Sequence, residues 1–487
     1  MIKVSNFENA TKNFFLRKKI GVLPSWFNTY KPSAQDVLDC IPIKPIAITA
    51  LTMAASNAMF GVVGAVIGFC GVTLYVLLNE RKAYTGWFLK PINQEVAPEV
   101  LEEIAEIEEP QQTGFSIQAM QDTLDSNNVA ATIVGYDDKG PRLILYKIKV
   151  KAGFNINMVS NLGDNFSRDL GLPAGVRVTV EANIGDGLAG LLIPKTTFDP
   201  ISTTQLLQFK CDEHIIPCLI GKDYLGNVST FDFAKAGHTL VGGQSGGGKS
   251  IQIANMILSM AFYAPPSLLQ MTMIDPKKVE MSIFKSIPHL TQPPITDMTY
   301  ATGILETLKA IMLERYQILE AAGVRNISEY NKHTKEKMPY HVVMVDEVGN
   351  LVMDSTPAYP DMKGSKATVG DVCEANLIAI AQMGRACGML LLLGTQRFDA
   401  KTFDGQLRSN ILSTIGFKVR KSSESVMLIE QAGCELLSGK GDCLVLLSGE
   451  TSPTRMQAAY INEDDISTLL STIVQKWSTN DISGETV

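Results

Sequence analysis

The 487-residue sequence is poor in the groups that build disulfide frameworks or transition-metal sites. Its eight cysteines form no Cys-x-x-Cys pair and no metal-ligand spacing, and its five histidines are scattered. We therefore expect reduced, buried thiols, as in cytosolic proteins, and no metal site built from these residues. A signal peptide is not predicted either, because the first apolar stretch begins late and lacks a cleavage site.

Charge is also sparse. Charged residues make up 19% of the chain, hydrophobic residues make up 45%, and the formal net charge is −7. This composition excludes a disordered chain and fits a globular protein of two or more domains with a membrane segment. The negative balance argues against a surface coated in basic groups. DNA binding stays possible, because a ring can keep its basic groups inside a pore.

Residues 45–79 carry no charged side chain. One membrane span needs about 20 residues, so this run is long for one span and slightly short for two. Basic residues on both sides favour both ends in the cytoplasm, which an even number of spans satisfies. We expect a transmembrane hairpin that anchors the chain in the cell membrane, with a single tilted span or a buried core hairpin as alternatives. A face of small residues suits close helix contact: Gly61, Gly64, Gly68 and Gly71.

The rest of the chain divides by composition and by the alternation of apolar residues. Strand patterns at 143–150 and 176–182, with a helical pattern between them, predict a small α+β subdomain. Alternating strand and helix patterns after it predict an α/β domain with a parallel central sheet. The expected segments are a cytoplasmic segment (1–44), the hairpin (45–79), an acidic linker (80–114), the α+β subdomain (115–204), the α/β domain (205–475) and a tail (476–487).

The most informative stretch is 238–250, which contains the pattern G-x4-G-K-S. Glycines let successive backbone N–H groups turn toward one point, and an apolar helix pattern follows, whose N-terminus would add free donors. A glycine-rich turn that binds nothing is the alternative, but the preceding apolar run and the following helix disfavour it. Lys249 would reach the β- and γ-phosphates, and Ser250 would bind Mg²⁺. The predicted ATP-binding residues are Gly243, Gln244, Ser245, Gly246, Gly247, Gly248, Lys249, Ser250 and Ile251.

A second apolar run, 341–345, ends in Asp346 and Glu347. A buried parallel strand would deliver both carboxylates to its C-terminal edge. We expect Asp346 to hold Mg²⁺ and Glu347 to polarise the attacking water, so the chain is predicted to be a nucleotide hydrolase. Another such run ends in Thr395 and Gln396, and Gln396 is placed to sense the γ-phosphate.

A third apolar run, 271–274, ends in Asp275, which would either lie near the nucleotide or form a surface Asp-Pro turn. Four arginines remain open between structural and catalytic roles on spacing alone: Arg385, Arg397, Arg408 and Arg420.

Taken together, these segments resemble the motor of the FtsK/SpoIIIE double-stranded DNA translocases, in the family's order. The matching segments are 239–250, 273–277, 288–291, 296–298, 314–316, 323–326, 343–348, 381–388, 395–397 and 431–433. The resemblance covers about residues 115–475. It implies a RecA-like P-loop domain behind the family's small α subdomain, and a hexameric ring that threads duplex DNA and moves it by hydrolysing ATP.

The sequence departs from the family pattern in ways that affect the expected role. Thr414 stands where the family usually carries an arginine, so the resemblance leaves Arg385 or Arg408 to act on a neighbouring subunit's nucleotide. The membrane part is short, and we expect no DNA-reading winged helix after about residue 466. These features look more like FtsK-like coupling proteins of conjugative elements, which implies secretion-channel and relaxosome partners.

Other functions stay open on sequence alone. A chromosome segregation motor, a viral packaging motor and a protein-export ATPase of the type VII kind are the alternative motors. The export ATPases usually carry several motor modules in tandem, and one is present here. A scaffold with a degenerate ATPase is disfavoured, because Lys249, Ser250, Asp346 and Glu347 are all intact.

Overall fold

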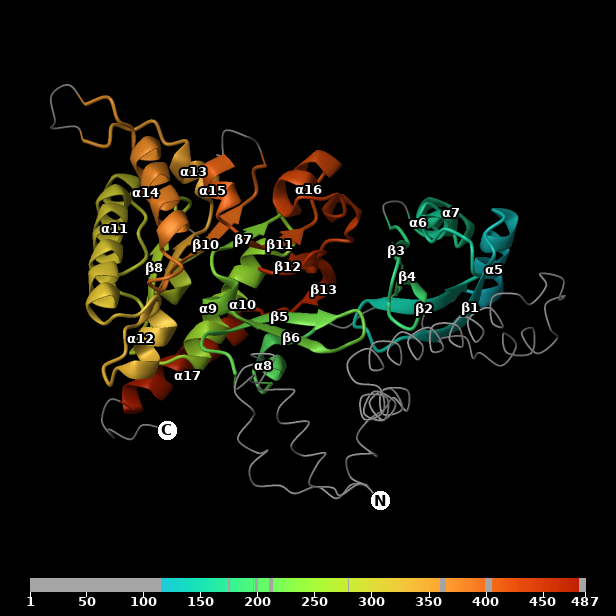
Figure 1. The fold of residues 1–487 in the computed structure, drawn as a ribbon, viewed down its shortest axis with the longest axis horizontal. Helices are drawn as coiled ribbons and strands as arrows, with labels where there is room; N and C mark the ends of the chain where they lie inside the picture. The colour runs from blue at the N-terminus through green and yellow to red at the C-terminus, as the bar shows by residue number, and fades with distance from the viewer. Residues whose placement is uncertain are drawn as a thin grey trace, which may run out of the picture. The chain divides into compact units, whose positions relative to one another are not determined.

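The structure, a computed structural model, describes residues 115–480 apart from 174–175, 196, 198–199, 210–212, 279, 360–364 and 399–404 (Figure 1). The predicted cytoplasmic segment, transmembrane hairpin and acidic linker lie outside the described residues. Within the described part of the chain, none of the helices is both long and apolar enough to cross a membrane.

The small subdomain contains a four-stranded antiparallel sheet in the order β1-β2-β4-β3. The predicted strand 143–150 is β2, whereas the second predicted strand is reduced to the three residues of β3. One face of the sheet packs on short helices around fully buried side chains such as Met120 and Phe166. Its elements are α5 (Ile117–Ser126), β1 (Ala131–Asp137), β2 (Leu143–Val150), α6 (Asn157–Ser160), α7 (Gly163–Asp169), β3 (Thr179–Glu181) and β4 (Ala189–Pro194).

The larger part of the chain contains a nine-stranded sheet in the order β6-β5-β13-β12-β11-β7-β10-β9-β8. Its strands are β5 (Pro217–Asp223), β6 (Val228–Asp232), β7 (Thr239–Gly242), β8 (Leu269–Ile274), β9 (Tyr340–Val345), β10 (Met389–Thr395), β11 (Ser413–Phe417), β12 (Asp442–Leu446) and β13 (Thr454–Ala458). The five strands from β11 to β8 are mutually parallel.

The prediction of a parallel sheet is wrong for the other four strands. These pair antiparallel, β12 with β11 and β13, and β5 with β13 and β6. Two of the pairs are hairpins with short connections, which can join only antiparallel strands. The central sheet is therefore mixed. The prediction failed because a strand pattern in the sequence does not reveal the direction in which the strand pairs.

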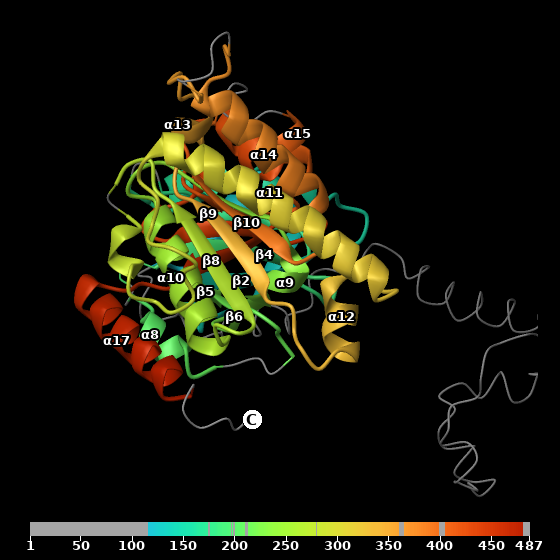
Figure 2. The same ribbon diagram turned by 90° about the vertical axis from the view of Figure 1, so that its left-hand side faces the viewer.

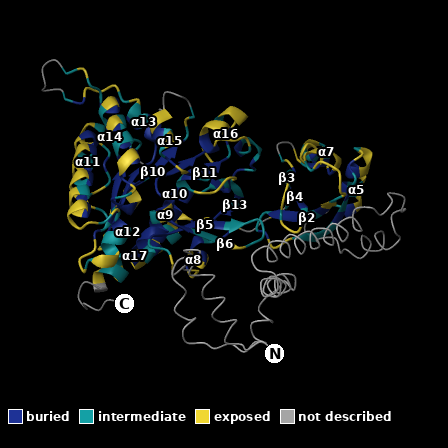
Figure 3. Cartoon of the chain, in the orientation of Figure 1, coloured by how far each residue is buried: buried dark blue, intermediate teal, exposed yellow. Residues whose placement is uncertain are grey.

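Helices cover both faces of the large sheet (Figure 2). Alternate residues of β9 point to opposite faces: Val342 and Met344 pack with α10 and α17, and Val343 and Val345 pack with α11 and α14. The strands are buried while the outer sides of these helices are exposed (Figure 3). The helices are α8 (Thr203–Leu206), α9 (Phe233–Ala236), α10 (Lys249–Tyr263), α11 (Met298–Ala321), α12 (Ile327–His333), α13 (Val348–Val352), α14 (Val369–Met383), α15 (Gly405–Ser409), α16 (Ser422–Ile429) and α17 (Glu463–Asn480).

A buried ion pair lies where the two sheets meet. Arg455 on β13 donates from Nε to Asp442 Oδ1 at 3.0 Å and from Nη2 to Oδ2 at 2.7 Å, and both side chains are at most 3% exposed. The same guanidinium donates to the Thr179 hydroxyl of β3. Burial alone would raise the pKa of Asp442, but the Arg455 charge and hydrogen bonds outweigh it, so the pKa is lowered.

Replacing Asp442 with alanine is expected to lower the free energy of unfolding by about 3–5 kcal/mol, because Arg455 would remain buried without its hydrogen-bonded carboxylate. The lowered pKa means that this stabilisation is complete at neutral pH and is lost as the pH falls through the folded value. Urea unfolding followed by circular dichroism measures the change. Asp164→Ala, which breaks an exposed pair with Arg177, is the control and should cost less than about 1 kcal/mol. Equal small losses in both variants would contradict the prediction.

Candidate active site

The glycine-rich loop connects β7 to α10 and requires glycine at two positions. Gly246 has φ 78° and Gly248, the N-cap of α10, has φ 125°. A Cβ on Gly248 would lie 2.9 Å from Phe417 and 3.0 Å from Gly441, so any side chain would disrupt the loop. The backbone N–H of Gly243 donates to the Thr395 carbonyl at 3.2 Å, which fixes the loop against the end of β10.

The parallel strands bring the predicted motifs together. The register pairs Thr395 at the end of β10 with Gly242 at the end of β7, and Val345 at the end of β9 with Ile274 at the end of β8. Since parallel strands end at the same edge of a sheet, the loop, Asp346–Glu347, Thr395–Gln396 and Asp275 all follow that edge. The residues predicted from four separate sequence segments are therefore neighbours in space.

Lys249 and Asp346 form a buried ion pair at the start of α10. Lys249 Nζ donates to Asp346 Oδ1 at 2.6 Å and to the Asp346 carbonyl at 3.2 Å. The two side chains are 3% and 1% exposed. Lys249 also lines the cavity described below, and a lysine at this position of a glycine-rich loop is suited to meet the phosphates of a nucleotide.

The oxygen atoms next to this pair fit Mg²⁺. Asp346 Oδ2 is buried and has no hydrogen-bond partner among the described residues, and the Ser250 hydroxyl lies on the adjacent first turn of α10. Mg²⁺ in nucleotide sites is held by one or two protein oxygens together with the substrate's phosphates, and when bound it neutralises phosphate charge. Ser250 and Asp346 would supply those protein oxygens.

Glu347 is buried and held by three donors. Its Oε1 accepts from the Thr395 hydroxyl at 3.2 Å and from the Gln396 backbone N–H at 3.0 Å. Its Oε2 accepts from Lys277 Nζ at 3.1 Å. A general base acts efficiently only when its carboxylate is held in place, and these contacts fix Glu347 from two neighbouring strands.

The turn after β8 was only partly anticipated. Asp275 is fully buried and accepts from the backbone N–H groups of Lys277, Lys278 and Met281 at 3.0–3.1 Å. Asp275 therefore organises this turn from inside, and the alternative of a surface turn is wrong. The same turn presents Lys277 to Glu347. Beyond it, Glu280 accepts a 2.8 Å hydrogen bond from the Ser250 hydroxyl, a contact that no motif indicated.

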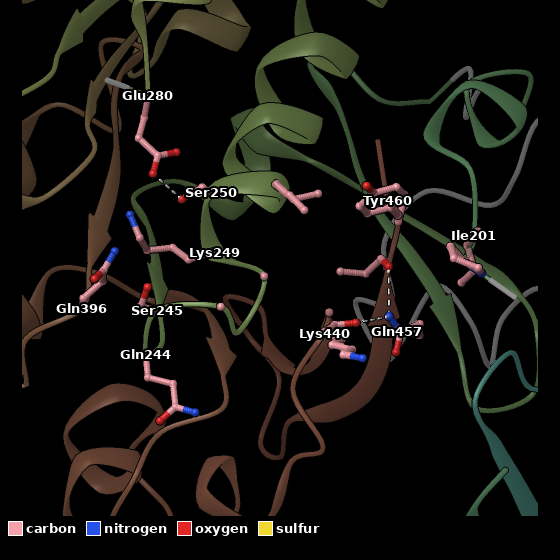
Figure 4. A pocket seen from close by; sticks show the side chains of 17 residues that line it. Ile201, Gln244, Ser245, Lys249, Ser250, Glu280, Gln396, Lys440, Gln457 and Tyr460 are labelled. Atoms are coloured by element: carbon pink, nitrogen blue, oxygen red, sulfur yellow. Dashed lines mark hydrogen bonds between the residues drawn. The ribbon is translucent and has the colours of Figure 1, made fainter. Parts of the chain in front are cut away.

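A cavity of about 440 Å³ lies over the loop, within the usual range for small-molecule sites. Figure 4 shows Lys249, Ser250, Glu280 and Gln396 on one side of it, and Ile201, Lys440, Gln457 and Tyr460 on the other. Gln244, Ser245, Gly246, Gly248 and Ile251 also line it.

The second side of this cavity was not predicted. Its apolar part comes from Ile201 and Tyr460, which are joined by a 2.7 Å hydrogen bond from the Tyr460 N–H to the Ile201 carbonyl. Together these apolar groups offer a surface for the nucleoside part of a nucleotide. They lie more than 250 residues apart in the sequence and belong to no motif, so only the fold reveals their proximity.

A loop at residues 439–441 links this side of the cavity to the small subdomain. Gly441 N–H donates to the Gly247 carbonyl at 2.9 Å. Arg142, from the start of the small sheet's second strand, donates to the Gly439 carbonyl at 2.8 Å and to Gln457 Oε1 at 3.0 Å. The small subdomain therefore contacts one wall of this cavity directly.

The two arginines predicted to act on a neighbouring subunit do not line the cavity of their own chain. Arg385 precedes β10, so it lies at the opposite edge of the sheet, and it donates to the Lys235 carbonyl at 2.7 Å. Arg408 donates to the Ile411 and Leu428 carbonyls at 2.8 and 3.0 Å, and burial lowers its pKa. Their role on a second subunit's nucleotide stays a prediction.

Comparisons with known proteins divide the chain between the same two parts that carry the two sheets. Residues 204–400 match the FtsK/SpoIIIE family and residues 98–195 match the FtsK alpha domain. The chain is 31% identical over 412 residues to the DNA translocase FtsK of Caldanaerobacter subterraneus subsp. tengcongensis, which covers 82% of this chain and 56% of that protein. It is 32% identical over 363 residues to the DNA translocase SftA of Bacillus subtilis, covering 73% and 36%. The chain thus spans about half or less of the length of these relatives.

Among solved structures, the conjugation coupling protein TcpA of pCW3, in a monomer form with ATPγS, has a similar fold. The TM-score is 0.50 at 19% identity, and the match covers 74% of this chain and 98% of that one. At this identity the likeness concerns the fold alone.

Replacing Glu347 with glutamine is expected to preserve nucleotide binding and to lower the hydrolysis rate by at least about 100-fold. The amide keeps the shape of the side chain and one acceptor for the Thr395 and Gln396 donors, but it is not basic enough to take a proton from water. Binding of a fluorescent ATP analogue and steady-state phosphate release measure the two effects separately. A variant that hydrolyses ATP at the wild-type rate would remove Glu347 from the reaction.

Proposed function

Because the chain belongs to the FtsK/SpoIIIE family, we propose that it is a motor that hydrolyses MgATP to move double-stranded DNA. The observation that supports hydrolysis most directly is the position of Glu347. Its carboxylate is held by Thr395, Gln396 and Lys277 beside a glycine-rich loop that opens onto a nucleotide-sized cavity.

In the proposed reaction each group has a separate task. The N–H groups of the glycine-rich loop and the Lys249 ammonium bind the phosphates, and Lys249 stabilises the charge that develops on the transferred phosphoryl group. Glu347 accepts a proton from the attacking water. Gln396, which lines the cavity and whose backbone contacts Glu347, is suited to report the γ-phosphate.

The proposed setting is conjugative DNA transfer from a membrane-anchored, hexameric ring. The uncharged run at 45–79 supports anchorage, with the ATPase on the cytoplasmic side. A ring that encloses DNA would contact phosphates through basic groups without reading the sequence. The acidic overall charge is compatible with such a ring, because the basic groups can lie inside the pore. Secretion-channel and relaxosome proteins are the partners this setting requires.

Loss of DNA transfer from donor cells that carry only Lys249→Ala, with chromosome segregation intact, would support the conjugative role over a segregation role.

The protein-export motor is the competing function from a different class. It predicts an ATPase that responds to a secreted polypeptide and is indifferent to duplex DNA. A packaging motor would also respond to DNA, so the response to duplex separates the export function from the DNA-moving functions as a group.

Linear duplex DNA of unrelated sequences is expected to stimulate the ATPase of the full chain in detergent several-fold, and Lys249→Ala is expected to abolish both basal and stimulated turnover. The physical reason is that the variant lacks the charge that stabilises the transferred phosphoryl group. Stimulation should fall steeply between 50 and 200 mM salt, because binding releases counterions from the DNA backbone.

An exposed lysine that does not line the cavity provides the control: Lys337→Ala should behave as wild type. A rate that does not change with duplex DNA, or DNA-stimulated turnover retained in Lys249→Ala, would contradict the proposal.

A further inference from the structure

Glu280 is a carboxylate of the nucleotide cavity to which neither the sequence motifs nor the reaction described above gives a role. It lines the cavity, and its Oε1 accepts a 2.8 Å hydrogen bond from the Ser250 hydroxyl (Figure 4). Ser250 is one of the two residues whose oxygens fit Mg²⁺. A carboxylate beside a triphosphate is repulsive unless a cation lies between them. The charge of Glu280 should therefore oppose the binding of free ATP and be compensated when Mg²⁺ accompanies the nucleotide.

The position of Glu280 depends on a built turn. Asp275, buried at the end of β8, accepts three backbone N–H groups of the turn, the last from Met281, the residue directly after Glu280. The Met281 side chain is itself buried in the core. The backbone on the C-terminal side of Glu280 is thereby fixed. The carboxylate reaches Ser250 from the segment that follows β8, a strand that is not adjacent to β7 in the sheet.

The hydrogen bond from Ser250 to Glu280 has a direct consequence for the serine oxygen. A hydroxyl that donates its proton to a carboxylate points its lone pairs away from that acceptor and becomes a better ligand for a cation. The other candidate acceptor in the site, Asp346 Oδ2, is buried and free of hydrogen bonds among the described residues. With Ser250 donating to Glu280, both the Ser250 oxygen and Asp346 Oδ2 have lone pairs for the metal.

From this geometry we propose that Glu280 is a positioning residue for Mg²⁺: it orients the Ser250 hydroxyl and makes nucleotide binding selective for the metal complex of ATP over free ATP. This inference rests on ATP binding as part of the proposed function. It does not depend on DNA.

The test compares the dissociation constant of a fluorescent, non-hydrolysable ATP analogue in EDTA with that in saturating Mg²⁺, on the full chain without DNA. The dissociation constant in EDTA divided by the dissociation constant in Mg²⁺ reports how much the metal strengthens binding. In Glu280→Gln the ratio is expected to fall about 10-fold, the lower end for the loss of a partner of a metal ligand. Binding in EDTA should be at least as tight as in wild type, because the repulsion between carboxylate and triphosphate is gone.

Two further variants make the outcome specific. Glu320→Gln removes an exposed carboxylate on α11 and should leave the ratio unchanged. In a Ser250→Ala background, Glu280→Gln should no longer weaken binding in Mg²⁺, because Glu280 orients the metal ligand through the missing hydroxyl. A Glu280→Gln variant whose ratio equals wild type, or whose two constants weaken together, would overturn the proposal. So would a full 10-fold effect in the Ser250→Ala background.

These outcomes are distinct from failure of the proposed function. A wild-type chain that binds no nucleotide under either condition would refute the ATP-driven motor itself. Nucleotide binding with an unaltered ratio in Glu280→Gln would refute only the role of Glu280.

Discussion

The candidate site depends on one constraint: parallel strands end at the same edge of a sheet. Strands β7, β10, β9 and β8 are adjacent and parallel, and each is followed immediately by polar residues. The glycine-rich loop, the carboxylates of Asp346 and Glu347, the Thr395–Gln396 pair and the turn at Asp275 consequently meet, although more than 150 residues separate the first from the last. Helices on both faces bury these strands, which gives the edge a rigid support.

Two cation–carboxylate contacts shape the electrostatics of this edge. Lys249 faces Asp346 and Lys277 faces Glu347, and three of these four side chains are at most 3% exposed. Leaving one of the three buried groups charged and without its partner would be costly, so the groups hold one another in position before a substrate arrives. The phosphates of a nucleotide offer Lys249 a second anionic partner, which connects nucleotide binding to the arrangement of the carboxylates.

The sequence allowed the local parts of this site to be predicted and failed for the parts that depend on distant contacts. The glycine-rich loop and the Asp346–Glu347 pair were predictable because their chemistry requires fixed residue types at short spacing. Glu280 and the wall formed by Ile201 and Tyr460 were not, because no short pattern marks residues that meet only through the fold. Strand direction was misjudged for the same reason: a strand pattern reports burial and not direction, and the antiparallel strands β12 and β13 each bury three of their five residues.

The most direct test of an ATP-driven DNA motor is displacement of a third strand. A triplex-forming oligonucleotide is bound at one end of a linear duplex, and its release by the full chain is followed by fluorescence. The account predicts release that requires hydrolysable ATP, is absent with ATPγS or with Glu347→Gln, and is delayed as the duplex ahead of the triplex is lengthened. ATP hydrolysis that proceeds on duplex DNA without any release of the third strand would contradict it.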